Sequence, residues 1–258
     1  MGSTELVNIE SALTGSLLEE GINMLAGALG ILGGMGPLAT ADFLSKLTVA
    51  TPANCDQVHI PVLVYGDCST PDRTASILGV GPSPLPKLLA GIEFLNRSGC
   101  AVIAVPCNSA HCWYEDMQRA SQIPVLHIVE SSAHKVRLNC AATRRVGVLS
   151  TEGTHRTGIY RSSLERLAFE VIEPTAQEFK EWVSPAIADI KAGRMAEAEF
   201  KFDLAADHLL LRGAEQIILG CTEIPLGMRA RCRAQQMGVV DSTQALVDAV
   251  LRHFSRTP

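Results

Sequence analysis

The 258-residue chain is 47% hydrophobic and 19% charged, enough apolar material to bury a core in one large or two modest domains. Its formal net charge is −5 and no run of basic residues is longer than the doublet Arg144-Arg145, so neither nucleic acid nor an anionic membrane is expected as a partner. No apolar run reaches the roughly 20 residues that a membrane-spanning helix needs. The acidic N-terminal segment and the eight cysteines predict a reducing, cytoplasmic location with free thiols.

Residues 1–27 form an extension with mild helical character, which we interpret as a frayed or dimer-packing segment. After it, short apolar runs alternate with helix-period segments, the pattern of an α/β fold. Helices are predicted over 177–190, with a break or kink at Pro185, over 195–211, and from Leu85 to a stop at Gly99. The Gly- and Pro-rich stretch 79–86 is either a lid or an ordinary surface loop. The predicted strands cover 28–33, 58–65, 101–106, 123–129, 145–150, 169–173, 215–219 and 237–241.

The chain also repeats itself at a nearly constant offset. The segment Gly30–Gly36 aligns with Gly147–Gly153, and the match continues without gaps into the helix that follows each copy. Further along, 124–131 resembles 237–242. Because the matching segments occur in the same order, we interpret the chain as two homologous halves.

Two cysteines follow predicted buried strands and precede small polar residues, in Cys107-Asn108-Ser109 and in Cys221-Thr222. Open α/β sheets bind ligands at such turns, where the free N–H groups of a helix start stabilise a thiolate or a carboxylate. A single cysteine is usually an inert apolar residue, but the matched pair predicts two thiols that face one ligand. Such a pair can act as base and acid on the two faces of a ligand, because a thiolate removes a proton from one face while a thiol delivers one to the other.

Polar groups beside the thiols are candidates for stabilising the resulting carbanion. The N–H groups and side chains of Asn108, Ser109 and Thr222 are suited to hold an α-carboxylate, and capping of the following helices is their ordinary alternative role. The glycine-rich turn that contains Met35 and Gly36 lets the backbone approach a substrate. The same turn is a poor dinucleotide fingerprint, because a proline interrupts the pattern.

Four motifs follow one another along the chain: Gly33-Gly34-Met35-Gly36-Pro37, Pro71-Asp72-Arg73-Thr74, Pro106-Cys107-Asn108-Ser109-Ala110-His111 and Gly220-Cys221-Thr222-Glu223-Ile224-Pro225. They resemble those of the aspartate/glutamate racemase superfamily, and those of its aspartate racemase branch in particular. The resemblance covers about residues 28–255. Glutamate racemases usually have Asp-Ser-Gly in the first motif and His after the second Cys-Thr, where this chain has Gly-Met-Gly-Pro and Glu223.

This resemblance implies a fold and an activity. The fold is two pseudo-twofold-related, flavodoxin-like, three-layer α/β/α domains with parallel sheets and the active site in the cleft between them. One half is expected to comprise residues 28–126 and 240–258, and the other 127–239, with 1–27 as the N-terminal extension. The activity is that of an isomerase that interconverts L- and D-aspartate, with glutamate as a second candidate substrate. It needs neither pyridoxal phosphate nor a metal, and the enzyme is expected to be a homodimer.

The resemblance also assigns roles to single residues. Cys107 and Cys221 become the catalytic groups, with Cys107 expected to serve the D face and Cys221 the L face. The polar residues that follow the two cysteines are again expected to bind the α-carboxylate of the substrate. Arg73, which matches its motif directly, and Lys191, which matches by position, are expected to bind the distal carboxylate of the substrate. Arg73 begins a predicted helix and Lys191 ends one, and without the resemblance a cation at a helix end is usually a solvated partner of the helix dipole.

Two other classes of function are consistent with a two-lobed α/β chain. One is another enzyme of the superfamily, a hydantoin racemase or a maleate isomerase-like protein; Arg73 with Lys191 argues for a free distal carboxylate instead. The other is a non-catalytic ligand-binding protein, which has no need of two opposed thiols.

A metal site is a further alternative at Cys107, His111 and Cys112, but no second Cys/His pair at zinc spacing completes it. His111 is expected either to tune the neighbouring thiol or to play a structural role. Glu223 is expected either to support the preceding threonine or to form a surface ion pair.

Overall fold

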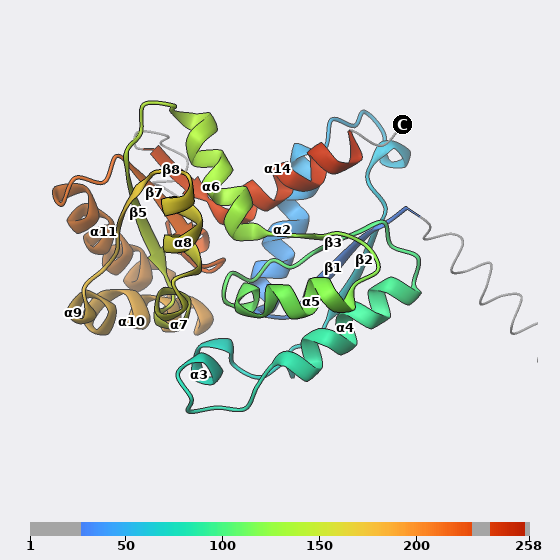
Figure 1. The fold of residues 1–258 in the computed structure, drawn as a ribbon, viewed down its shortest axis with the longest axis horizontal. Coiled ribbons are helices and arrows are strands. Elements are labelled where there is room, and N and C mark those ends of the chain that lie inside the picture. Colours follow the sequence, from blue (N-terminus) through green and yellow to red (C-terminus); the bar gives the residue numbers. More distant parts are fainter. Residues whose placement is uncertain (1–26, 229–237, 256–258) are drawn as a thin grey trace, which may run out of the picture.

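The computed structural model describes residues 27–228 and 238–255, so the predicted extension lies outside the described residues except for Gly27. Two parallel four-stranded sheets form the centre of the molecule, in the orders β2-β1-β3-β4 and β6-β5-β7-β8 (Figure 1). All eight predicted strands are present, most of them one to four residues shorter than predicted at an end. Their bounds are β1 Leu29–Gly33, β2 Val62–Gly66, β3 Val102–Ala104, β4 Val125–Leu126, β5 Arg145–Ser150, β6 Glu170–Ile172, β7 Gln216–Gly220 and β8 Gly238–Asp241.

The two sheets share one topology, which confirms the predicted α/β class. The repeated segments occupy equivalent positions, because β1 and β5 are both second in their sheets and both lie between the strands that follow them in the sequence. Every strand pair is parallel, and the inner strands β1, β3 and β7 are buried along their whole length. Buried strands of this kind read as continuous apolar runs, which is why the sequence revealed them.

Helices connect the strands and cover the sheets. Helix α4 shows the expected periodicity, since Leu88, Ile92 and Leu95 are fully buried on one face. The bounds are α2 Pro37–Ala50, α3 Arg73–Ile77, α4 Leu85–Arg97, α5 Tyr114–Ala120, α6 Ile128–Asn139, α7 Glu152–Thr157, α8 Ile159–Arg166, α9 Ala176–Glu178, α10 Ser184–Lys191, α11 Met195–Leu211, α12 Ile224–Gly227 and α14 Ser242–Phe254, with the single turns η1 Asp56–Val58, η2 Ser109–Trp113 and η3 Phe179–Val183.

The helix predicted over 177–190 is interrupted, as Pro185 suggested. A π turn, η3, separates α9 from α10, and Pro185 lies in the first turn of α10. Proline has no N–H to donate to the preceding turn, so the regular hydrogen-bond ladder cannot continue through it. The stretch 79–86 runs from the end of α3 into α4, and the N–H of Val80 bonds back to the carbonyl of Ala75 at 2.9 Å.

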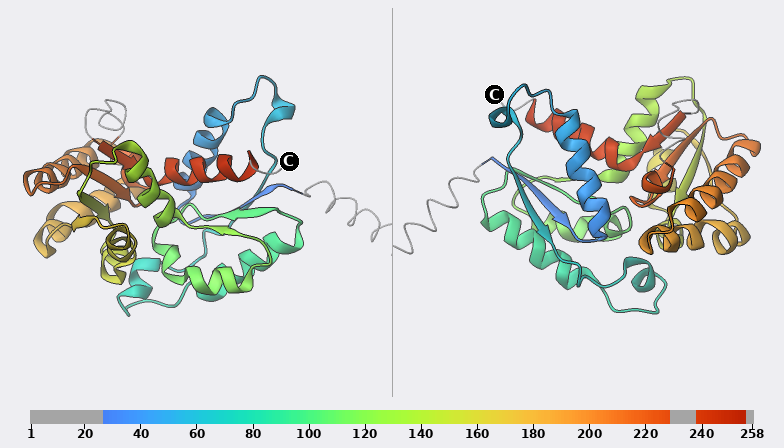
Figure 2. Two further views of the ribbon diagram at one scale, coloured as in Figure 1. Left: turned by 45° about the horizontal axis from the view of Figure 1, so that its top comes forward. Right: turned by 180° about the vertical axis from the view of Figure 1, so that it is seen from behind.

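Helix α14 connects the two halves of the molecule, by which we mean the parts of the chain that form the sheet of β1–β4 and the sheet of β5–β8. It follows β8 of the second sheet and packs against both α6 and α2 (Figures 1 and 2). Beside it, the Lys46 ammonium on α2 lies 2.5 Å from Asp42 and 2.6 Å from Asp241, and Asp241 also caps α14.

The division of the chain into one domain of 28–126 plus 240–258 and another of 127–239 remains a prediction. Among the described residues, the helices are too short or too polar to span a membrane.

Candidate active site

The turn after β1 brings backbone close to the cleft between the sheets. Gly34 has φ +86°, and a Cβ there would lie 2.6 Å from the backbone of Asp67, so only glycine fits. The Gly34 N–H donates to the Thr40 hydroxyl on α2 at 3.0 Å. The turn therefore holds Met35, which is 2% exposed, against the candidate site.

The turn after β3 carries the first candidate thiol and is fixed by a buried hydrogen-bond network. The side chain of Asn108 accepts from the Tyr160 hydroxyl at 2.5 Å and donates to Ser242 Oγ at 3.0 Å. Ser242 donates in turn to the carbonyl of Leu219, two residues before Cys221, at 2.7 Å. The network thus connects the turn after β3 directly to the end of β7. With both polar groups of its amide engaged, Asn108 acts here as a link between the turns, and its role toward an α-carboxylate remains a prediction.

Ser109 joins the same turn to the other half. Its Oγ lies 2.8 Å from Thr154 Oγ1 and 3.1 Å from Thr151 Oγ1, at the start of α7. Helix α3 packs on α7 at this point, because Gly153 leaves room for Thr74. A Cβ at Gly153 would come within 2.9 Å of Thr74 Cα. This close approach determines where the start of α3 lies.

Helix α3 begins with the two charged residues of the second motif. Asp72 caps the helix by accepting from the N–H of Ala75 at 2.8 Å. Arg73 Nη1 donates to the carbonyl of Pro71 at 3.0 Å, whereas its Nε is buried without a partner within the described part of the chain. Burial works against the charge of Arg73, but attraction to Cys107 and Asp72 outweighs it and raises the pKa of the guanidinium. Arg73 therefore stays cationic and keeps one N–H free for a ligand.

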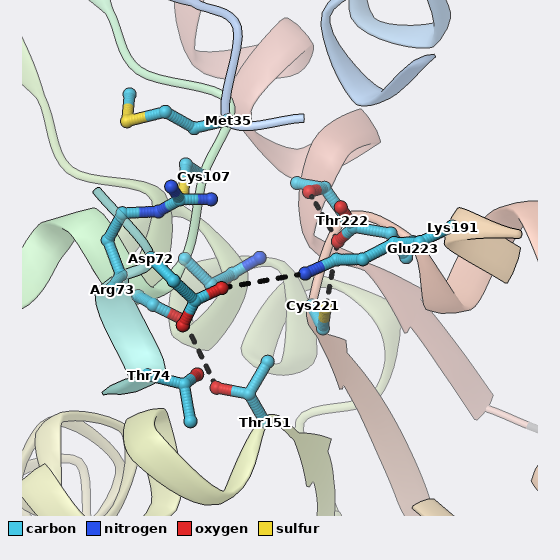
Figure 3. A pocket seen from close by; sticks show the side chains of 12 residues that line it. Met35, Asp72, Arg73, Thr74, Cys107, Thr151, Lys191, Cys221, Thr222 and Glu223 are labelled. Atoms are coloured by element: carbon cyan, nitrogen blue, oxygen red, sulfur yellow. Dashed lines mark hydrogen bonds and ion pairs between the residues drawn. The ribbon is translucent and has the colours of Figure 1, made fainter. Parts of the chain in front are cut away.

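Lys191 reaches the site from the opposite half. It is the last residue of α10, and its Nζ lies 3.8 Å from Asp72 Oδ2, across the mouth of the site (Figure 3). Both side chains of this ion pair are about half exposed, so the pair is worth little in stability and is free to open.

Cys221 follows β7 and is 4% exposed, with Thr222 and Glu223 buried beside it. Glu223 Oε2 accepts from Cys221 Sγ at 3.0 Å and from Thr222 Oγ1 at 3.3 Å. Burial and the adjacent carboxylate together raise the pKa of the Cys221 thiol well above its usual value. Glu223 therefore supports Thr222, one of its two expected roles, and among the described residues it forms no surface ion pair.

These groups line one small cavity of about 20 Å³, room for about one water molecule. A second cavity of about 370 Å³ adjoins it and shares Asp72, Arg73, Lys191 and Glu223 with it. An amino acid is larger than the small cavity, so its binding beside the two thiols requires these shared side chains to move apart. The small cavity is lined by Met35, Asp72, Arg73, Thr74, Cys107, Asn108, Ser109, Thr151, Lys191, Cys221, Thr222 and Glu223.

Of the nine site residues predicted from the sequence, eight line the small cavity, and Gly36 lines the adjoining one. The prediction missed Asp72, Thr74, Thr151 and the bond between Glu223 and Cys221. The first two flank Arg73 in its motif. A signal for Thr151 was present, since the repeat aligns it with the glycine turn after β1.

His111 has a structural role in the turn after β3. Its Nε2 accepts from the N–H of Ile128 at 3.2 Å, and its Nδ1 then donates to the carbonyl of Cys107 at 2.9 Å. Burial lowers the pKa of this imidazole, so the ring is neutral. Within 27–228 and 238–255, no three His, Cys, Asp or Glu side chains are grouped to hold a metal ion.

Comparison with known proteins identifies the family. The model of the Asp/Glu/hydantoin racemase family matches residues 32–250. The broad specificity amino-acid racemase RacX of Bacillus subtilis is 29% identical over 204 residues, which are 76% of this chain and 85% of the relative. The structure of Picrophilus torridus aspartate racemase superposes with a TM-score of 0.78 at 27% identity, covering 89% of this chain and 95% of that one.

A glutamate racemase from Francisella tularensis, solved with D-glutamate, shares the fold at 16% identity, with a TM-score of 0.67 over 89% of this chain and 81% of that one. The family match spans both sheets and both cysteine turns. Together with the two-sheet architecture and the paired motifs, it shows that this chain belongs to the Asp/Glu/hydantoin racemase family.

Proposed function

We propose that this racemase interconverts L- and D-aspartate by two-thiol proton transfer, without a cofactor. The observation that carries the proposal is that Cys107 and Cys221, from different halves, line the same cavity with Arg73 and Lys191. One thiolate removes the Cα proton from one face of the substrate, and the opposite thiol donates its proton to the other face. Each turnover exchanges the protonation states of the two sulfurs.

The polar residues of the cavity support the two carboxylates of such a substrate. The helix start that follows Cys107 and the hydroxyl of Thr222 would hold the α-carboxylate as charge flows into it. The partner-free Nε of Arg73 and the ammonium of Lys191 would bind the distal carboxylate, once Lys191 releases Asp72. Two cations at the mouth favour a dicarboxylate over a neutral amino acid. We also propose a homodimer in the cytoplasm, for which sedimentation of the purified enzyme checks the assembly.

Exchange with solvent deuterium tests this function. The enzyme is incubated in D2O with each enantiomer of aspartate, glutamate and alanine, and deuterium at Cα is followed together with optical rotation. We expect deuterium to enter both enantiomers of aspartate, with glutamate slower and alanine slowest. A chelator or hydroxylamine should leave the rate unchanged. Faster exchange of alanine than of aspartate, or loss of activity with chelator, would contradict the proposal.

A further inference from the structure

The two candidate thiols have neighbours of opposite charge. Cys107 lies beside the Arg73 guanidinium, whose pKa rises through attraction to that sulfur against the effect of burial. Cys221 instead donates to the Glu223 carboxylate, 3.0 Å from its sulfur, and Glu223 is only 7% exposed (Figure 3). The same Oε2 of Glu223 also accepts from Thr222 Oγ1 at 3.3 Å, so one carboxylate oxygen lies against both the thiol and the hydroxyl.

Among the described residues, the other charged groups around Cys221 do not cancel the effect of Glu223. Lys191 from α10 acts in the opposite direction, but burial and Glu223 outweigh it and raise the pKa of the thiol. Tyr160 from α8 is close enough to interact with the sulfur and is neutral, because burial raises the pKa of its hydroxyl. On α3, Asp72 and Arg73 line the same cavity with opposite charges, and Asp72, about half exposed, pairs with Lys191.

We propose that Glu223 is a positioning residue that keeps the hydrogen on Cys221, so that the resting enzyme has Cys107 as the proton acceptor and Cys221 as the proton donor. The inference rests on the proposed two-thiol function. It adds to that function that the two protonation forms of the free enzyme differ in energy. The form with the hydrogen on Cys221 therefore predominates.

The proton transfers balance from this starting state. The Cα–H bond of the substrate breaks, its proton binds Cys107 Sγ, and the electron pair remains on the carbanion. The S–H bond of Cys221 then breaks as its proton forms a new Cα–H bond on the opposite face. The negative charge left on Cys221 faces the Glu223 carboxylate, and repulsion between like charges favours prompt reprotonation of the sulfur.

Alkylation by iodoacetamide measures the protonation of each thiol without any substrate, because the thiolate is the reactive form. Peptide mass spectrometry of the full chain across a pH series separates Cys107 from Cys221. In the wild-type protein we expect Cys107 to react at lower pH than Cys221. In Glu223→Gln, which preserves shape and removes the charge, the onset for Cys221 should move down by about one pH unit, a roughly tenfold faster reaction at a fixed pH below the onset.

Two further variants make this result specific. Glu223→Asp keeps the charge, so the onset should stay closer to wild type than in Glu223→Gln. If the Gln variant fails to fold, the order in which Cys107 and Cys221 react in the wild-type protein remains the test. Glu178→Gln removes another buried carboxylate, one that pairs with Arg212 on the far side of the second half, and should leave the onset unchanged.

Kinetics give an independent readout. In Glu223→Gln the basic limb of the kcat/KM profile should move to lower pH, because loss of the like charge makes Cys221 lose its proton more easily. The proposal is overturned if Cys221 alkylates before Cys107 in the wild type, or if its onset is the same in wild type and Glu223→Gln. If the alkylation pattern is as expected but no deuterium exchange occurs, the role of Glu223 stands and the proposed function fails.

Discussion

At the scale of single residues, the site combines residues that sequence motifs predict with contacts that no motif predicts. The cysteines and Arg73 belong to motifs with recognisable order and spacing. The contact between Glu223 and Cys221 depends instead on side-chain rotamers and burial, which spacing does not specify. Glu223 could be noticed from the sequence as a departure from the glutamate racemase pattern, but the atom it contacts came only from the structure.

Substitution of Arg73 tests most directly whether the substrate is a dicarboxylate. Arg73→Ala removes a partly buried cation with a free N–H, so kcat/KM for aspartate should fall about 100-fold or more, and far more than for alanine or asparagine. Steady-state kinetics on the three substrates measure the difference. The matched control is Arg156→Ala, whose side chain is 65% exposed on α7, and it should behave as wild type. Equal losses on charged and neutral substrates would show a structural role for Arg73.

At the scale of elements, the packing of α3 on α7 positions the charged residues of the site. The sequence correctly predicted that a helix begins at Arg73 and that one ends at Lys191. It could not predict that α3 packs on the other half of the chain, because that contact depends on a missing side chain at Gly153 rather than on any periodicity.

Gly153→Ala tests that contact. The new methyl group would meet the Thr74 backbone at 2.9 Å, so α3 must shift and the unfolding free energy should fall by about 1–3 kcal/mol. A displacement of about 1 Å at the site reduces catalysis by up to about 100-fold, and kcat/KM for aspartate should fall accordingly. Urea denaturation and kinetics measure the two effects. Gly66→Ala, whose Cβ would meet open space, is the control and should change neither. Wild-type values for Gly153→Ala would exclude this contact as a determinant of the site.

At the scale of the whole molecule, one buried hydrogen-bond network connects the two halves. Tyr160 from α8, Asn108 from the turn after β3 and Ser242 at the start of α14 form a chain that ends on the strand before Cys221. The relative position of the two thiols therefore depends on polar groups from three separate parts of the sequence.

Tyr160→Phe removes one connection of that network. The Asn108 carbonyl oxygen loses its 2.5 Å partner in a buried position, which should lower the unfolding free energy by about 1–3 kcal/mol. Chemical denaturation measures the loss. Tyr65→Phe, on the edge strand β2 and outside the network, should stay within about 0.5 kcal/mol of wild type. Similar stabilities for the two variants would mean that the network contributes little.

The sequence predicted the fold more completely than the site. Buried parallel strands are short apolar runs, and the repeat shows that two such sets exist, so the eight strands and the α/β class follow from local pattern. The strand ends and the π turn before Pro185 depend on hydrogen bonding across the fold. Of the site, the sequence predicted the two cysteine turns and the two cations, but it missed Asp72 and Thr74, although both belong to the motif of Arg73, and it missed Thr151.

The central claim is that two thiols, one from each half, carry the proton transfers. Cys107→Ser and Cys221→Ser, made singly, test it most directly, with racemisation of D- and L-aspartate followed in D2O and the fold checked by circular dichroism. Serine is a far weaker acid than cysteine, so each variant should lose about 100- to 10,000-fold in rate in both directions. Cys140→Ser, at an exposed cysteine outside the site, should retain the wild-type rate. Near-wild-type turnover by either active-site variant would contradict the account.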